Sequence, residues 1–188
     1  GTMVEKGMAV AAARRDMVGR LAAFIELGAG PFPGAELALL GGPEGWLDEG
    51  PALEAEERLR KALYDERSRD ARDGRTNTGP HRTDLGVCFM AKQQEAALCS
   101  TGEQKALLIT LVLAHARMLA AEQGCCPILL LDEVAAHLDQ ERRLALFDLL
   151  DELKTQVWMT GTDATLFEGM QGRADFFDVA DGRVSMNS

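Results

Sequence analysis

Two adjacent carboxylates, Asp132 and Glu133, are the residues of this chain best suited to chemistry. They follow four aliphatic residues, Ile128 to Leu131, a run without alternation that predicts a strand buried on both faces of a helix-covered parallel sheet. The acids are then expected at the end of the strand, where open α/β sheets bind ligands. Phosphoryl transfer needs one carboxylate to hold Mg²⁺ and a second group to orient or deprotonate the attacking water, and this pair could supply both. A buried strand followed by acids of no function would show the same letters, so neighbouring segments must decide.

A second candidate site, S-T-G-E-Q-K from Ser100 to Lys105, precedes a long apolar helix reaching about Ala121. Ser100 or the next residue would cap this helix, and Glu103 would close a capping box with Ser100. A cap does not explain Gly102, because glycine disfavours the first turn of a helix made of strong helix formers. Free backbone N–H groups, the helix dipole and hydroxyls around a glycine would also form an anion site.

Helices and strands alternate after the second site, which predicts an α/β fold with parallel pairing through right-handed crossovers. Before it, Thr83 to Met90 and Glu95 to Leu98 are expected to form a hairpin around Gln93 and Gln94. The elements expected after Leu131 are a helix over 140–153, a strand over 156–160, a short helix over 165–170 and a final strand over 176–180 turning into Val184.

The first part of the chain is expected to be a helical arm. Met8 to Leu27 has the spacing of an amphipathic helix, and a second helix should run from Pro51 to about Asp70. Between them, Glu36 to Leu40 is either a strand or a packed loop. A turn-rich joint over 73–82 predicts a boundary between two regions, 4–72 and 73–186.

Charge argues against a wholly basic nucleic-acid coat, since the net charge of the 188 residues is −10. A local basic strip is still compatible with phosphate contacts, and residues 58–82 carry a positive excess. Ion pairs on an exposed helix are the alternative explanation of that strip. The residues expected to contact DNA are Arg14, Arg15, Arg67, Arg69 and Arg72.

The four cysteines have no framework spacing and are expected to be reduced, mostly buried thiols of a cytosolic protein. No apolar segment is expected to approach the roughly 18 residues that span a bilayer, and no signal peptide opens the chain. These patterns predict a soluble, cytoplasmic protein with no membrane contact.

The order of motifs resembles the carboxyl-terminal half of an ABC-type ATPase head. Ser100 to Lys105 is similar to the signature motif, Ile128 to Glu133 to Walker B, and Ala136 to Asp139 to the D-loop, with Thr162 where the switch histidine usually stands. The joint G-x-T-x-x-G-P-H-R-x-D-L, Gly74 to Leu85, resembles the RecF family, SMC-like recombination mediators of bacteria. The resemblance implies a mostly parallel sheet flanked by helices, with an inserted helical lobe.

The resemblance also implies a role for each site residue. Asp132 would hold the water shell of Mg²⁺, and Glu133 would polarise the hydrolytic water. Ser100 and Gly102 would face the γ-phosphate of ATP bound by a second subunit. The nucleotide-binding residues would be Ser100, Thr101, Gly102, Gln104, Lys105, Asp139 and Thr162. Thr162 in place of histidine would make a weaker phosphate contact and fits slow turnover.

The P-loop pattern G-x-x-x-x-G-K-[ST] does not occur in the sequence, so the chain is expected to be a fragment without ATPase activity of its own. The intact protein is expected to be a weak DNA-dependent ATPase that uses ATP and Mg²⁺, forms a homodimer on ATP binding, and binds single-stranded, gapped or junction DNA. With RecO and RecR it would help load recombinase in gap repair and the SOS response.

Two other functions are compatible with parts of the pattern: the nucleotide-binding subunit of an ABC transporter, and a non-catalytic interaction module with a purely structural acid pair. The preferred interpretation requires Ser100 and Asp132 to lie at one edge of a single sheet.

Overall fold

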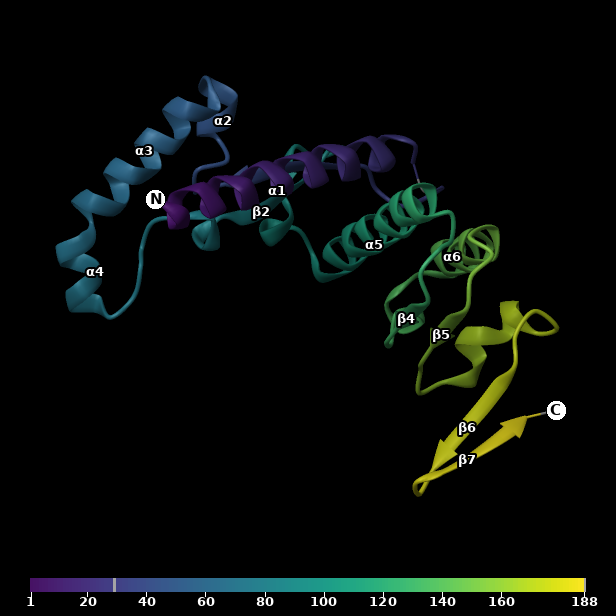
Figure 1. Cartoon of the computed structure of the whole chain (residues 1–188). Coiled ribbons are helices and arrows are strands. Elements are labelled where there is room, and N and C mark those ends of the chain that lie inside the picture. The colour runs from purple at the N-terminus through teal and green to yellow at the C-terminus, as the bar shows by residue number, and fades with distance from the viewer. Residues whose placement is uncertain (29, 188) are drawn as a thin grey trace. The chain divides into compact units, whose positions relative to one another are not determined.

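The computed structural model describes residues 1–28 and 30–187 and divides into two compact units, residues 1–118 and 119–188 (Figure 1). The elements that begin in the first unit are α1 (Thr2–Glu26), β1 (Ala35–Leu40), α2 (Trp46–Glu49), α3 (Ala52–Asp65), α4 (Arg67–Asp73), η1 (Pro80–Arg82), β2 (Asp84–Phe89), β3 (Gln94–Glu95), η2 (Ala96–Leu98) and α5 (Thr101–Gln123). The second unit contains β4 (Leu129–Leu131), η3 (Ala135–His137), α6 (Gln140–Glu152), β5 (Val157–Met159), η4 (Ala164–Met170), β6 (Phe176–Ala180) and β7 (Arg183–Asn187).

The strands confirm the predicted α/β class, but they form three sheets rather than one within the described residues. Among residues 1–28 and 30–187, β4 and β5 are the only strands that pair in parallel, and β1–β2–β3 and β6–β7 are antiparallel. The turn between β6 and β7 explains why these two strands are antiparallel. Asp181 and Gly182 both have positive φ, 49° and 72°, as a two-residue turn between antiparallel strands requires. Ser100 follows β3 of the first sheet and Asp132 follows β4 of the second, so the expectation that both residues lie at one edge of a single sheet was wrong for the described residues.

The core of the first unit lies between α1, α5 and the β1–β2 pair. Leu21 and Ile25 of α1 pack with Leu107, Ala114 and Met118 of α5, while side chains of β1 and β2 cover the cluster. α1 ends where predicted, with Gly28 at φ 79° after the cap residue. Burial of this apolar face therefore fixes the long helix that Ser100 precedes.

α5 corrects one expectation from the sequence. It is 23 residues long, and an 18-residue window within it has a mean hydropathy of 1.3, so by length and composition it could cross a membrane. The expectation that no segment approaches this length was therefore wrong. Because Leu107, Ala114 and Met118 lie in the core of the unit, the helix has the properties of a core helix and says little about a membrane.

The helical arm is more divided than the sequence predicted. The second helix begins at Ala52, directly after Pro51, but it breaks at Glu66 into α3 and α4, and the short α2 precedes it. Val4 and Met8 of α1 pack against Ala55 and Leu59 of α3. The boundary at residue 72/73 stays a prediction.

The predicted return strand of the hairpin is mostly wrong. Of the predicted strand Glu95 to Leu98, Glu95 alone pairs with β2, next to Gln94 before it, and Ala96–Leu98 forms the 3₁₀ turn η2. The backbone carbonyls of η2 accept hydrogen bonds from side-chain amides and not from a neighbouring strand. Gln94 Nε2 donates to Leu98 O at 2.8 Å, and Gln104 Nε2 donates to Ala96 O at 3.0 Å. The chain therefore turns sharply into α5.

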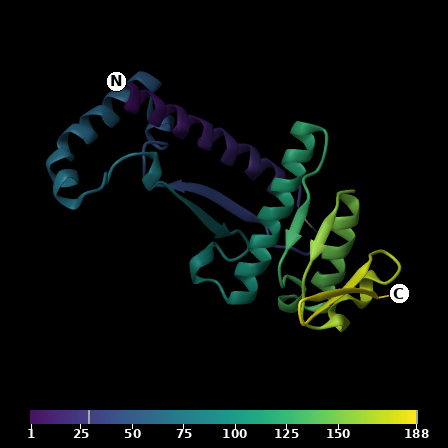
Figure 2. The same ribbon diagram turned by 60° about the horizontal axis from the view of Figure 1, so that its bottom comes forward.

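In the second unit, α6 lies alongside the parallel β4–β5 pair (Figure 2). Leu146, Phe147 and Leu150 of α6 are buried, and Phe147 stacks on Phe167 at 6.3 Å between ring centroids. Leu130 of β4 is nevertheless 77% exposed. The prediction of a strand buried on both faces is wrong for this chain, because Leu130 and its register partner Trp158, which is 51% exposed, both remain largely open to solvent.

The four cysteines form no disulfide within the described residues, but the expectation that most are buried was wrong. Cys99 is buried, Cys88 and Cys126 are half-buried, and Cys125 is exposed. Cys125 and Cys126 lie in the loop after α5, outside the core. Desolvation by burial raises the pKa of the Cys126 thiol.

Candidate functional site

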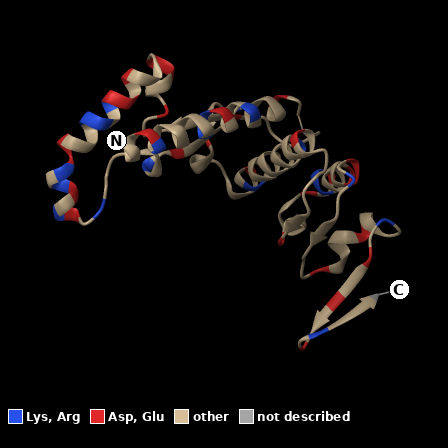
Figure 3. Ribbon diagram, viewed as in Figure 1, with Lys and Arg blue, Asp and Glu red and all other residues tan. Residues whose placement is uncertain are grey.

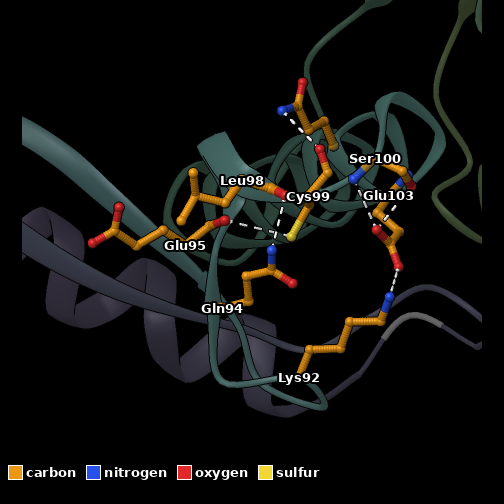
Figure 4. Close-up of polar contacts among 8 residues, drawn as sticks. Lys92, Gln94, Glu95, Leu98, Cys99, Ser100 and Glu103 are labelled. Atoms are coloured by element: carbon orange, nitrogen blue, oxygen red, sulfur yellow. Dashed lines mark hydrogen bonds and ion pairs between the residues drawn. The ribbon is translucent and has the colours of Figure 1, made fainter.

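Ser100 and Glu103 form the predicted capping box at the start of α5 (Figure 4). The backbone N–H and the hydroxyl of Ser100 donate to Oε2 of Glu103 at 2.9 and 2.8 Å. In return, the backbone N–H of Glu103 donates to the Ser100 hydroxyl at 3.4 Å. The cap therefore occupies the same Ser100 groups that the sequence assigns to an anion.

Lys92, from the turn between β2 and β3, forms an ion pair with Oε1 of Glu103 (Figure 4). Its hydrogen bond, followed by those from Ser100, lowers the pKa of Glu103 to about 2. The same contact raises the pKa of Lys92. Sequence reasoning missed Lys92, since only the fold of the hairpin brings it to the helix.

Gly102 lies in open space at the exposed start of α5. A Cβ added there meets no atom within 4 Å, and the backbone is not in the left-handed region, so neither packing nor conformation in this chain requires a glycine. Thr101 is exposed beside it, and Lys105 is half-buried. The amide of Gln104 is engaged with backbone carbonyls, including Cys99 O at 3.2 Å.

The acid pair lies at the carboxyl end of β4, as predicted. Asp132 is exposed and accepts a hydrogen bond from the hydroxyl of Thr160, which follows β5. The same hydroxyl accepts from the backbone N–H of Glu133 at 3.1 Å. Thr160 N donates to Leu131 O at 3.1 Å, so the polar contacts continue the strand pairing by one residue.

Glu133 adopts a left-handed conformation, φ 53°, which is uncommon outside glycine and asparagine. Such backbone strain persists where surrounding contacts hold it, and here Thr160 supplies one of them. Sequence reasoning missed Thr160 and chose Thr162 two residues later. The signal was available: Thr160 stands directly after its strand, as Asp132 does after its own.

Asp139 caps α6, because its Oδ1 accepts from the backbone N–H of Arg142 at 2.8 Å. Thr162 is exposed beyond the end of β5. Asp163, next to it, accepts from the hydroxyl and backbone N–H of Thr165, and these hydrogen bonds lower its pKa. Gly161 is needed sterically, since a Cβ there would lie 2.6 Å from the Phe167 ring.

The two arginines predicted on α1 differ in environment. Arg14 donates to Glu44 Oε1 at 2.7 Å and to Pro80 O at 2.6 Å, and Glu44, only 1% exposed, also accepts from the Thr83 hydroxyl at 2.5 Å. Arg15 forms an exposed ion pair with Asp48 at 2.7 Å. Arg14 thus ties α1 to the joint before β2.

The remaining predicted DNA contacts, Arg67, Arg69 and Arg72, lie exposed on α4, where basic and acidic residues alternate (Figure 3). Arg69 lies 3.5 Å from Glu66 and 3.7 Å from Asp73, which matches the alternative explanation by ion pairs along the helix. Arg69 itself is exposed and both contacts are long, so its guanidinium stays accessible.

Carboxylate oxygens are suitable ligands for Mg²⁺, and Asp132 presents one at the surface. Within residues 1–28 and 30–187, no three His, Cys, Asp or Glu side chains gather in a cluster that could hold a metal. This donor set fits Mg²⁺, which usually takes one or two carboxylates and completes its shell with water and phosphate oxygens.

A hollow of about 680 Å³ in the second unit is lined by residues of η4, β6 and β7, including Phe167, Phe176 and Met186. None of the predicted site residues is among its lining residues. The acid pair lies on the open surface at the end of β4 instead.

Similar proteins match nearly the whole chain, although no protein-family model matches it. The chain is 53% identical over 184 residues to "DNA replication and repair protein RecF" of Mesorhizobium japonicum, which covers 97% of this chain and 48% of the relative. It is 54% identical over 185 residues to the protein of that name in Brucella abortus, with the same coverage. The chain belongs to the RecF family. It spans about half the length of the curated RecF relatives it matches.

Solved RecF structures share the fold. A structure of the recombination mediator RecF-ATPrS in the RecFOR pathway matches 98% of this chain and 48% of its own, with a TM-score of 0.74 and 23% identity. A structure of RecF-ATP in the same pathway matches with a TM-score of 0.69 and 21% identity. At these identities the likeness establishes the architecture of the RecF chain and no residue role.

Proposed function

We propose that the complete protein carrying this chain is a RecF-type recombination mediator that binds ATP and DNA. The observation that carries the proposal is 53% identity, over 97% of the chain, to a protein named for DNA replication and repair. The ATP named in the related RecF-ATP structure supports the choice of nucleotide. These relatives favour this function over a transporter subunit.

Asp132 and Glu133 divide the chemistry of hydrolysis between them in this proposal. Asp132 would hold Mg²⁺, which neutralises charge on the β- and γ-phosphates when bound. Glu133 would accept a proton from the attacking water or orient it. The Thr160 hydroxyl supports both roles, because it contacts the carboxylate of Asp132 and the backbone of Glu133.

Ser100 and its neighbours would bind the γ-phosphate of a nucleotide held by a second subunit, making ATP the link of a homodimer. The open space at Gly102 supports this assignment, since it leaves the backbone N–H groups of the first turn approachable. Thr101, Gln104 and Lys105 stay predictions for the same site.

DNA binding, cooperation with RecO and RecR, recombinase loading in gap repair, a part in the SOS response and a cytoplasmic location are further parts of the proposal. Arg15 and the arginines of α4 are the most accessible predicted DNA contacts. Charge reversal of Arg67, Arg69 and Arg72 together should weaken binding to gapped DNA and flatten its dependence on salt. An unchanged salt dependence would remove α4 from the interface.

Glu133→Gln in the complete protein tests the catalytic assignment. The amide keeps the shape of the side chain but cannot act as a base, so we expect ATP binding to persist, hydrolysis to be lost and the ATP-bound dimer to live longer. Glu152→Gln, an exposed change at the end of α6, is the matched control. Turnover at the level of this control would favour a purely structural acid pair, as in a non-catalytic interaction module.

A further inference from the structure

Glu103 creates an electrostatic conflict at the proposed phosphate site. Its carboxylate lies 2.8 Å from the Ser100 hydroxyl and 2.9 Å from the Ser100 backbone nitrogen, the two donors a phosphate would use. A bare carboxylate there would both occupy those donors and repel an incoming polyanion. A nucleotide should therefore bind more tightly when the Glu103 carboxylate is neutralised or has another partner.

Lys92 provides that other partner. The Glu103 carboxylate divides its two oxygens, with Oε1 on the Lys92 ammonium and Oε2 on Ser100. The ammonium also lies 5.9 Å from the centroid of the Phe89 ring, a second contact that holds it near the hairpin. Lys92 is eleven residues from Glu103 in the chain, and the short β3 and η2 segments between them bring it back to the start of α5.

We propose that Lys92 is a positioning residue for nucleotide binding: it retains the Glu103 carboxylate when a triphosphate takes over the Ser100 hydroxyl and backbone N–H. The inference rests on the proposed function, because it assumes that Ser100 meets ATP. Lys92 itself touches neither nucleotide nor reacting atoms. Its effect should appear in the ATP concentration required and leave the rate of the chemical step unchanged.

The test compares variants of the complete protein by the ATP concentration giving half-maximal dimerisation and by kcat. Lys92→Ala should raise the half-maximal concentration about fivefold, the effect of one close unpaired like charge at a surface, with kcat unchanged. Lys92→Arg should restore the wild-type value, and Lys6→Ala, an exposed lysine of α1, serves as the matched control. If Lys92→Ala lowers the melting midpoint, Lys92→Met is tested in its place, because methionine keeps an apolar side chain next to Phe89.

A charge-compensation cycle then asks whether Lys92 acts through Glu103. In the Glu103→Gln background the carboxylate is gone, so adding Lys92→Ala should change the half-maximal concentration by less than about twofold. An equal shift in both backgrounds, or no shift in either, overturns the role of Lys92.

Ser100→Ala separates this inference from the proposed function. If Ser100→Ala weakens ATP-dependent dimerisation while Lys92→Ala leaves it unchanged, the Lys92 role is wrong and the nucleotide site stands. If Ser100→Ala has no effect, the nucleotide assignment of Ser100 is wrong, and the role of Lys92 falls with it.

Discussion

The Thr160 hydroxyl donates a hydrogen bond to the Asp132 carboxylate from the end of the neighbouring strand. Because Leu131 and Met159 are partners in the parallel register, the residues that follow them lie side by side. The same hydroxyl accepts from the Glu133 backbone, so one side chain restrains both acids. A residue with no charge and no motif of its own thus fixes the geometry of the acid pair.

Thr160→Val should reduce ATP turnover by the complete protein about five- to tenfold, the equivalent of one hydrogen bond of about 1 kcal/mol. Valine keeps the shape but neither donates to Asp132 nor accepts from Glu133, so the Mg²⁺ concentration for half-maximal activity should also rise. Thr160→Ser keeps the hydroxyl and should stay near wild type. Wild-type turnover and Mg²⁺ dependence in Thr160→Val would contradict a positioning role.

Gly102→Ala should separate stability from function. Since the added methyl meets no atom within 4 Å and alanine favours helices, the free energy of unfolding should rise by up to about 1 kcal/mol. ATP-dependent dimerisation should weaken, because the methyl obstructs approach to the first turn of α5. Denaturant unfolding and dimerisation assays measure the two effects.

Gly161→Ala is the contrasting control, since its methyl would lie 2.6 Å from the Phe167 ring, which stacks on Phe147. Overpacking there should cost about 1–3 kcal/mol of stability. Unimpaired ATP-dependent dimerisation of the Gly102→Ala variant would mean that Gly102 has no role in nucleotide binding.

Local patterns predicted the parts of the candidate site that depend on neighbouring residues. The capping box of Ser100 and Glu103 needs only a spacing of three, and the exposed end of β4 needs only an aliphatic run followed by acids. Both were predicted correctly for that reason. The turn from Ala96 to Leu98 was mispredicted as a strand, because bonds from Gln94 and Gln104 decide its backbone.

Contacts set by tertiary structure could not be predicted in the same way. Thr160 reaches Asp132 across 28 residues, and only the strand register reveals the contact. Lys92 reaches Glu103 because a turn with a positive φ at Gln93 reverses the chain beside it. Leu130 is exposed although its sequence indicates a buried strand, since burial depends on what covers the sheet.

Arg14→Ala should destabilise the chain by about 3 kcal/mol, because it leaves the buried Glu44 carboxylate without the Arg14 counter-ion. Arg15→Ala is the matched control, since the adjacent exposed pair with Asp48 should contribute about 0–1 kcal/mol. Urea unfolding of both variants gives the difference. Equal midpoints would show that the Arg14 contact contributes no more than the exposed one.

Acid should release the Glu103 cap over a low pH range. Hydrogen bonds from Lys92 and then Ser100 lower the pKa of this carboxyl from 4.5 to about 2, so the folded state binds its proton less readily than the unfolded state does. The stabilisation is therefore fully present above pH 4.5 and disappears as the pH falls toward 2. NMR titration of the Glu103 carboxyl carbon should give a midpoint near 2, and Lys92→Met should move it upward toward 4.5. A wild-type midpoint already at 4.5 would mean that Lys92 does not hold this carboxylate in solution.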